Sequence, residues 1–126
     1  MKIVELAFTV NPVTNVQRAR EFYEGVLGLT PSVVHEGHGM AWVEYEVGPG
    51  VLALGFGVEQ FKPSGDGGTV ALEMENFEEA IRELKERGCR FIFEPMETPV
   101  CRMAGVFDSE GNTLIIHKRK TGSGTQ

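Results

Sequence analysis

Two glutamates and a histidine are the side chains in this sequence that best suit catalytic or metal chemistry. Glu5 and Glu73 each interrupt an apolar run that is typical of a β-strand, and His117 closes a third such run. Carboxylates and an imidazole on one surface can transfer protons or hold a divalent metal ion. For Glu73 a solvated strand-end charge is the stronger explanation, and for His117 a structural hydrogen bond is at least as good. An unpaired carboxylate at Glu5, flanked by apolar residues, would be costly to bury.

The elements that must position these residues occur twice along the chain. Each copy consists of a strand, an amphipathic helix and three further strands, and each helix has an N-terminal capping signal and a closing glycine. The expected strands are 3–10, 32–36, 40–47 and 50–56 in the first copy, and 69–74, 90–93, 100–107 and 112–118 in the second. The expected helices are 15–27 and 77–87.

Two such copies in 126 residues predict one domain of the α+β class. Two βαβββ modules in tandem would form a curved mixed sheet, a cup with its concave face between the modules. The expected single domain covers 1–120, with module one at 1–57, a linker at 58–68 and module two at 69–120. A disordered tail is expected at 121–126.

Composition narrows the class of protein and its location. The net charge of −6 argues against general affinity for nucleic acid or for anionic membranes. No apolar stretch approaches the roughly 20 residues that span a bilayer, and the first residues lead directly into a strand pattern, so neither a membrane anchor nor a secretory signal is expected. The chain has two cysteines, Cys89 and Cys101, which we interpret as reduced thiols of a cytoplasmic protein.

Side-chain alternation along the strands predicts which residues line the concave face. In the first strand, Leu6, Phe8 and Val10 are expected to pack beneath the helix, which leaves Glu5 and Thr9 on the concave face. The same reasoning extends to the other strands of both modules. The expected ligand-binding residues are Glu5, Thr9, Trp42, Glu44, Ala53, Phe56, Thr69, Glu73, Ile115 and His117.

The strand at 40–47 leaves two registers open. One register presents Trp42 and Glu44, together with Glu46, to the cup, and the other presents Val43 and Tyr45.

A His-x-x-His spacing, His35 and His38, lies before this strand, and His38 has a glycine on each side. Without cysteines or a third donor nearby, the spacing is a weak metal signal. The flanking glycines favour a mobile lid over the mouth of the cup.

Three segments carry a resemblance to a known family. They are Ala19–Leu29, Val70–Asn76 and Asp108–His117, and together they involve both halves of the chain. In these segments the sequence resembles the vicinal oxygen chelate superfamily, which includes glyoxalase I, bleomycin- and fosfomycin-resistance proteins, methylmalonyl-CoA epimerase and extradiol dioxygenases. The resemblance implies paired βαβββ modules that form a cup and commonly assemble as a homodimer.

The resemblance also implies which positions would hold a metal. Metal-dependent members supply ligands from four positions, which fall here on Glu5, Ala53, Thr69 and Ile115. A transition-metal ion needs about three or four good protein donors, and these positions offer one carboxylate. We therefore expect no metal ion or other cofactor bound in the family's manner.

The leading interpretation is a metal-independent protein that binds a small organic molecule in the cup, as bleomycin-resistance proteins do. Glu5 and Glu44 would suit a cationic or hydroxylated ligand, and Trp42 and Phe56 would offer stacking surfaces. The expected partners are this ligand and a second copy of the chain.

Two alternatives remain open. The protein could be a metal-dependent lyase or isomerase of glyoxalase I or epimerase type, or have a dioxygenase-related activity, with a rearranged site of Glu5, Glu73 and His117. Glu5 and His117 would then be its catalytic residues. The cup could instead be filled by side chains in a dimeric interaction module, although small residues such as Ala53 and Ala71 argue against this.

Overall fold

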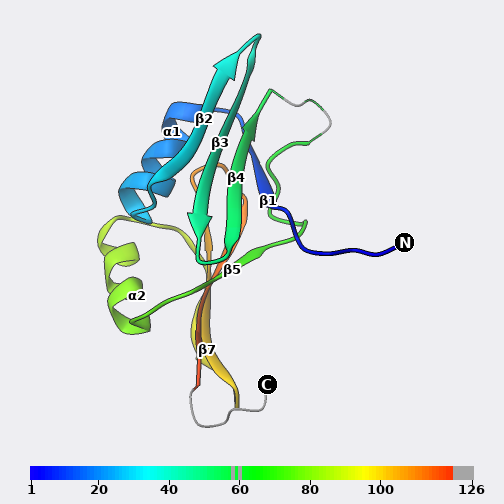
Figure 1. The fold of residues 1–126 in the computed structure, drawn as a ribbon. Helices are drawn as coiled ribbons and strands as arrows, with labels where there is room; N and C mark the ends of the chain where they lie inside the picture. The colour runs from blue at the N-terminus through cyan, green and yellow to red at the C-terminus, as the bar shows by residue number, and fades with distance from the viewer. Residues whose placement is uncertain (58, 60, 121–126) are drawn as a thin grey trace. The chain divides into compact units, whose positions relative to one another are not determined.

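The computed structural model describes residues 1–57, 59 and 61–120 and divides the chain into two compact units. Unit 1 is Met1–Pro63 and unit 2 is Ser64–Gln126, so the division falls within the expected linker. Each unit consists of one four-stranded sheet and one helical segment (Figure 1). The tail expected at 121–126 lies outside the described residues.

Unit 1 has the order β-α-β-β-β. Its elements are β1 (Thr9–Val13), α1 (Val16–Arg20), which continues as the π-helix η1 (Glu21–Val26), β2 (Pro31–Gly37), β3 (Met40–Val47) and β4 (Gly50–Phe56). The sheet order is β1-β4-β3-β2, in which β1 runs parallel to β4 and the other neighbours are antiparallel.

Unit 2 repeats this order and topology. Its elements are β5 (Val70–Glu73), α2 (Phe77–Glu86), β6 (Phe91–Glu97), β7 (Cys101–Phe107) and β8 (Thr113–Arg119). The sheet order is β5-β8-β7-β6, with β5 parallel to β8. The prediction of an α+β fold with two tandem βαβββ modules is therefore confirmed.

Both helical segments begin at an asparagine that caps them. The side-chain oxygen of Asn15 accepts a hydrogen bond from the backbone N–H of Arg18 at 2.9 Å, and that of Asn76 accepts one from Glu79 at 3.0 Å. These bonds satisfy N–H groups that have no partner within the helix. The second half of the first helix differs from the expected α-helix, because the Leu27 N–H bonds to the carbonyl of Phe22, five residues earlier.

One face of each sheet packs against its helical segment. In unit 1, Figure 1 shows α1 lying against the strands. The buried side chains of this unit include Phe22, Tyr23, Val43, Tyr45, Leu52 and Leu54. In unit 2, Phe77 and Leu84 are buried, as are Ala104, Val106, Leu114 and Ile116 of the sheet. Each large side chain buried this way contributes about 1.5–3 kcal/mol. The opposite surface of each sheet is called below its helix-free face.

The first strand lies later in the chain than the expected 3–10. β1 begins at Thr9 and pairs with β4 from Thr9 opposite Leu52 to Val13 opposite Phe56. The residues before it are in no strand, and the side chains of Ile3 and Leu6 are 81% and 89% exposed. In the sequence, Pro12 indicates the end of a strand. However, β1 is an edge strand of its sheet, and proline is tolerated there.

No helix in the part of the chain that the structure describes is long and apolar enough to cross a membrane.

Candidate functional site

Trp42 is the centre of the helix-free face in unit 1. Its indole Nε1 donates a hydrogen bond to Glu44 Oε2 at 2.7 Å, and the Phe8 ring meets it edge-on with centroids 5.2 Å apart. Gly55 lies opposite Trp42 on β4, and a Cβ atom there would be 3.5 Å from the indole. The glycine thus lets the indole lie close to the strand, while the carboxylate fixes its orientation.

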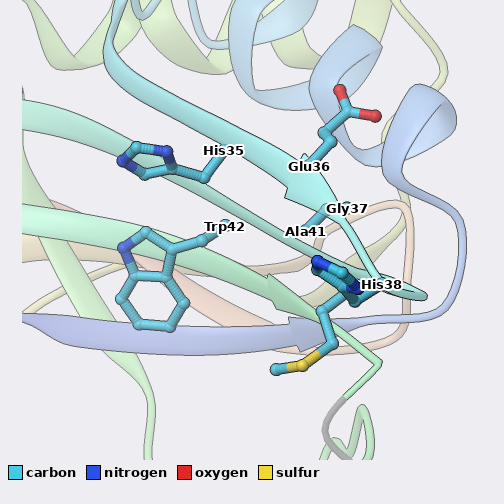
Figure 2. Close-up of a pocket in the computed structure, with 7 residues that line it drawn as sticks. His35, Glu36, Gly37, His38, Ala41 and Trp42 are labelled. Atoms are coloured by element: carbon cyan, nitrogen blue, oxygen red, sulfur yellow. The ribbon is translucent and has the colours of Figure 1, made fainter.

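An open pocket of about 330 Å³ adjoins Trp42 at the end of the β2–β3 hairpin. It is lined by His35, Glu36, Gly37, His38, Met40, Ala41 and Trp42. Figure 2 shows the His35 and Trp42 rings on the same side of the hairpin, with Glu36 directed away from them. His35 pairs directly with Trp42 across the two strands, so the two rings form one aromatic surface.

The position of β1 overturns the expected faces of the first strand. Asn11 Nδ2 donates a hydrogen bond to the Tyr23 hydroxyl at 2.9 Å on the helix side, whereas Val10 Cγ2 lies beside Gly55 on the helix-free face. By alternation Thr9 belongs with Asn11 and Val13, so the prediction that Thr9 faces away from the helix and Val10 toward it was wrong.

The same shift removes Glu5 from the sheet. Glu5 lies four residues before β1 in an exposed segment, so its expected place as an inward-facing strand residue was wrong. The cost of burying its charge, which favoured a functional role, therefore does not arise.

The structure settles the register that the sequence left open in β3. Val43 and Tyr45 are buried on the helix side, so Trp42 and Glu44 lie on the helix-free face with Glu46. Ala53 lies on this face too, since it pairs with Glu44, but it is 0% exposed and therefore offers no surface to a ligand.

Phe56 does not share the face of Trp42. It pairs with Ala41 and Val13, which are both buried on the helix side, so its expected position on the concave face was wrong. Strict alternation from Leu52 and Leu54 already places Phe56 with them.

Phe8 and His35 are the residues of this surface that the sequence reasoning missed. The sequence signal for His35 is the pair His38-Gly39, since a residue followed by glycine suits a two-residue hairpin turn, and both residues have the positive φ, 56° and 76°, that such a turn requires. That turn fixes Gly37 opposite Met40 and hence His35 opposite Trp42. The segment expected to be a mobile lid is therefore a regular hairpin.

Glu73 and His117 form a hydrogen-bonded pair in unit 2, as their neighbouring strands allow. His117 Nδ1 lies 2.7 Å from Glu73 Oε1, and Glu73 Oε2 accepts the backbone N–H of Arg119 at 2.8 Å. Burial alone would raise the pKa of Glu73, but the hydrogen bonds from Arg119 and His117 outweigh it and lower the pKa overall. Glu73 is thus a held carboxylate rather than a freely solvated charge.

The two remaining predicted residues of unit 2 lie near this pair. Ile115 is two residues before His117 on the same face of β8, and it pairs with Ala71. Thr69 comes directly before β5, in alternation with Ala71 and Glu73.

The residues at the family's metal positions do not fit a metal ion. Ala53 and Ile115 have no side-chain donor atom, and Glu5 lies outside β1. In the part of the chain that the structure describes, His, Cys, Asp and Glu side chains form no group of three or more that could hold a metal.

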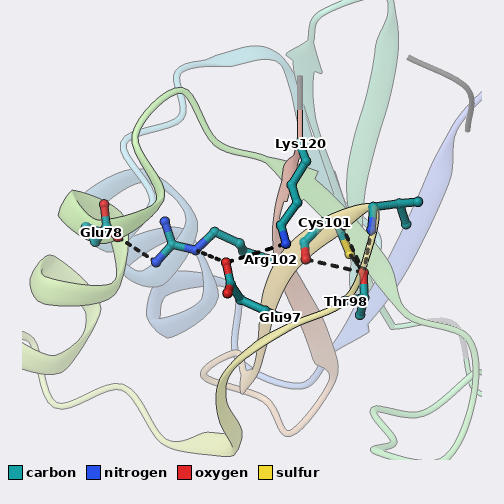
Figure 3. A network of polar contacts seen from close by, with 7 residues as sticks. Glu78, Glu97, Thr98, Cys101, Arg102 and Lys120 are labelled. Atoms are coloured by element: carbon teal, nitrogen blue, oxygen red, sulfur yellow. Dashed lines mark hydrogen bonds and ion pairs between the residues drawn. The ribbon is translucent and has the colours of Figure 1, made fainter. Parts of the chain in front are cut away.

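The most extensive charged network of unit 2 connects its helix to its sheet (Figure 3). Arg102 on β7 pairs with Glu78 of α2 at 2.5 Å and with Glu97 of β6 at 3.6 Å, and Lys120 also approaches Glu97, at 3.7 Å. The two carboxylates are largely exposed, so each pair contributes little to stability. We interpret the network as structural.

Neither cysteine has the surroundings of a reactive thiol. Cys101 is buried beside the Thr98 hydroxyl, 3.2 Å from its sulfur. Burial, reinforced by Asp108, raises the pKa of the Cys89 thiol. A raised thiol pKa disfavours the thiolate that acts as a nucleophile.

Comparisons with known proteins give one family. Residues 5–116 match the family described as the Glyoxalase/Bleomycin resistance protein/Dioxygenase superfamily. No curated protein sequence matches the chain.

Solved structures similar to this chain support the same fold. TnmS3, an antibiotic binding protein from Streptomyces sp. CB03234, is 22% identical with a TM-score of 0.81, over 95% of this chain and 99% of that one. A glyoxalase/bleomycin resistance protein from the same Streptomyces is 23% identical with a TM-score of 0.73, over 92% and 100%. UcmS2 is 21% identical with a TM-score of 0.77, over 92% and 98%. At these identities the likeness concerns the fold.

Proposed function

Because the chain belongs to the glyoxalase/bleomycin resistance protein/dioxygenase superfamily, we propose that it binds a small organic molecule without a divalent metal ion. The proposed binding surface is the helix-free face of unit 1. That a similar structure is named an antibiotic binding protein supports a binding role rather than a particular ligand.

The observation that carries this proposal is the hydrogen-bonded pair of Trp42 and Glu44. An indole held by a carboxylate presents a flat apolar surface beside a fixed negative charge. The other carboxylate oxygen of Glu44 makes no hydrogen bond within the described residues, so it is available to a ligand. The adjoining pocket, with His35 opposite Trp42, extends this surface.

A planar aromatic cation is the ligand class that this surface suits best. Stacking on an aromatic ring is worth about 0.5–1.5 kcal/mol beyond its buried area, and a cation over the ring adds about 0.5–2 kcal/mol. The net charge of −6 also favours the approach of a cation.

Metal independence is part of the proposal. It is supported by Ala53 and Ile115, which replace ligands at central strand positions of the two units. A protein that only binds its ligand has no need of an ion that polarises substrate oxygens.

Calorimetric titration with proflavine, a planar aromatic cation, tests the binding role, and anthracene-2-carboxylate is the matched anion. We expect proflavine to bind and the anion to bind at least about tenfold more weakly, since repulsion by Glu44 replaces attraction. Because Trp42 is the single tryptophan of the chain, quenching of its fluorescence reports where the ligand lies. Absence of heat and of quenching across a panel of aromatic cations would contradict the proposal.

Two variants separate the charge of Glu44 from its position. Glu44→Gln keeps an acceptor for the indole but removes the charge, and we expect about tenfold weaker proflavine binding. Glu46→Gln removes an equal charge from the same strand and face, outside the Trp42 pair, and should weaken binding less. Equal losses would show that only the overall charge matters.

A second candidate function is favoured by the Glu73–His117 pair. In a metal-dependent lyase or isomerase, Glu73 and His117 would contribute ligands to the ion or move a proton. Elemental analysis of protein purified without chelator distinguishes the candidates. Stoichiometric metal that is lost in Glu73→Ala would favour the enzyme, and metal-free wild-type protein would favour the binding role.

We also propose a cytoplasmic homodimer. The exposed apolar side chains of Ile3, Val4 and Leu6 support a second copy, which would cover them, and the free cysteines support a reducing compartment. Light scattering after size-exclusion chromatography should give twice the mass of one chain, and a monomeric mass would contradict the dimer.

A further inference from the structure

The Glu73–His117 pair fixes the tautomer of its histidine. Glu73 Oε2 accepts the backbone N–H of Arg119 at 2.8 Å, and an ionised carboxylate can only accept hydrogen bonds. Nδ1 of His117 must therefore donate at 2.7 Å, which leaves the lone pair of a neutral imidazole on Nε2. This nitrogen makes no hydrogen bond with any residue that the structure describes, and the side chain is 23% exposed. The pair thus presents one oriented acceptor.

The surface beside this acceptor is apolar. Across the sheet from β5 to β6, one row of paired residues runs Glu73, His117, Met103 and Met96. The adjacent row runs Ala71, Ile115, Gly105 and Phe93. The Phe93 ring covers Gly105, where a Cβ atom would approach the ring to 2.5 Å. Methionine sulfur makes favourable contacts with aromatic rings, and Met96 is 46% exposed.

The charges near His117 favour a neutral hydroxyl over an anion. The Glu73 carboxylate faces the ring from β5, and Arg119 of β8 approaches that carboxylate at 3.8 Å. From β7 and β6 the facing residues are Met103 and Met96, which carry no charge. An anionic ligand would be repelled by Glu73, whereas an O–H group can donate to Nε2.

We propose that the helix-free face of unit 2 is a binding site for a phenolic hydroxyl. His117 Nε2 accepts the hydrogen bond of the hydroxyl, and the aromatic ring lies over Met103 and Met96. Glu73 is a positioning residue, because it selects the imidazole tautomer without touching the ligand. The proposed site uses no metal ion and no residue of unit 1.

Ligand-observed fluorine NMR with 4-fluorophenol and 4-fluoroanisole tests the proposal. The methyl ether has the same ring but no O–H donor, so it isolates the hydrogen bond. Above neutral pH we expect the phenol to bind about tenfold more tightly than the ether. Equal binding of the two probes, or binding of neither, would overturn the proposal.

Matched variants test whether the Glu73–His117 pair causes the preference for the phenol over the ether. The amide of His117→Asn can still donate to Glu73 but has no atom at the position of Nε2, so the preference for the phenol should disappear. Glu75→Gln, a neighbouring exposed carboxylate outside the pair, should leave it unchanged. A preference that survives in His117→Asn would overturn the assignment, and thermal unfolding of each variant confirms that it is folded.

The positioning role of Glu73 has its own readout. A two-bond proton–nitrogen correlation spectrum should show the Nδ1–H tautomer of His117 in the wild type and a mixture in Glu73→Gln, with a smaller preference for the phenol. An unchanged tautomer would contradict this role. Because it requires no substitution of His117, this measurement also decides the case if His117→Asn fails to fold.

Discussion

The two units build the same sheet but place different chemistry at the same positions. In unit 1 the row Pro12, Gly55, Trp42 and His35 crosses the helix-free face, and in unit 2 the corresponding row is Glu73, His117, Met103 and Met96. Unit 1 therefore has its large rings on the hairpin strands and a carboxylate, Glu44, beside them. Unit 2 has its polar pair on the parallel strands and soft apolar side chains on the hairpin.

This difference separates what the repeated backbone determines from what it leaves free. Two strand pairings fix which residues share a row. The first strand pairs in parallel with the fourth, and the strands of the hairpin pair with each other. Residues on the helix side of each sheet must stay apolar to form the core, whereas residues on the helix-free face can diverge. One chain thus carries an acid-and-aromatic surface and an oriented histidine on two copies of one frame.

Substitutions in the buried core of each unit should have the largest effects on the free energy of unfolding. Leu54 and Ile116 occupy the same position in the last strand of their units, and they are 1% and 0% exposed. Leu54→Ala and Ile116→Ala should each lower the free energy of unfolding by about 2–5 kcal/mol in urea titrations. Val34→Ala, at an exposed strand position, should cost about 0.5 kcal/mol or less. A cost near that of Val34→Ala at either core position would show that the two cores are not equivalent.

The helix-free faces differ in how tightly a glycine is covered. At Gly105 a Cβ atom would meet the Phe93 ring at 2.5 Å, whereas at Gly55 its nearest contact would be Val10 at 3.3 Å. Gly105→Ala should therefore destabilise by about 1–3 kcal/mol and Gly55→Ala by less, as measured by urea unfolding. The reverse order would mean that Phe93 moves aside easily and that Trp42 is the more tightly packed ring.

Local patterns predicted most of the fold because its elements carry their own signals. The bounds of β3 and β4 agree with the sequence, as does the cap at the start of the second helix. The failure at β1 has a physical cause, since Asn11 is buried only because the Tyr23 hydroxyl accepts its amide hydrogen bond. A bond between residues twelve positions apart is invisible to strand alternation.

The candidate site was less predictable than the fold. Alternation placed Trp42 and Glu44 on one of two faces, but their hydrogen bond and the contact with Phe8 depend on side-chain rotamers and on the path of the N-terminal segment. In unit 2, the row that brings Met96 to Met103 passes an irregular register in β6. Such an irregularity breaks the period-two rule on which the sequence prediction depended.

The N-terminal caps of the two helices should contribute equally to the free energy of unfolding. Asn15 and Asn76 accept the same hydrogen bond, at 2.9 and 3.0 Å, at the start of their helices. Asn15→Ala and Asn76→Ala should each cost about 0.5–2 kcal/mol of unfolding free energy, and aspartate at either position should restore most of it. A much smaller cost at Asn15 would indicate that the π-helical segment that follows has little dependence on its N-terminus.

Acid should affect the two units unequally, and this is the smallest effect we expect. In unit 1, burial tends to raise the pKa of Glu24, but hydrogen bonds from Arg20 at 2.6 Å and from Tyr45 at 2.9 Å lower it overall. Glu73 in unit 2 also has a lowered pKa. A carboxyl group whose pKa is lower in the folded chain stabilises it at pH values above the ordinary value of 4.5. This stabilisation is lost as the pH falls from that value through the lowered one.

Glu24→Gln and Glu73→Gln should therefore reduce the difference in unfolding free energy between pH 7 and pH 3. The reduction should be larger for Glu24→Gln, because its side chain is 26% exposed and pairs with a buried tyrosine, whereas Glu73 is 38% exposed. Urea titrations of both variants and of Glu75→Gln, a carboxylate outside both networks, provide the measurement. If Glu73→Gln flattens the acid dependence more, then the backbone N–H of Arg119 and the imidazole of His117 hold the Glu73 carboxylate more strongly than Arg20 and Tyr45 hold that of Glu24. The histidine pair would then be the more tightly organised polar group of the two units.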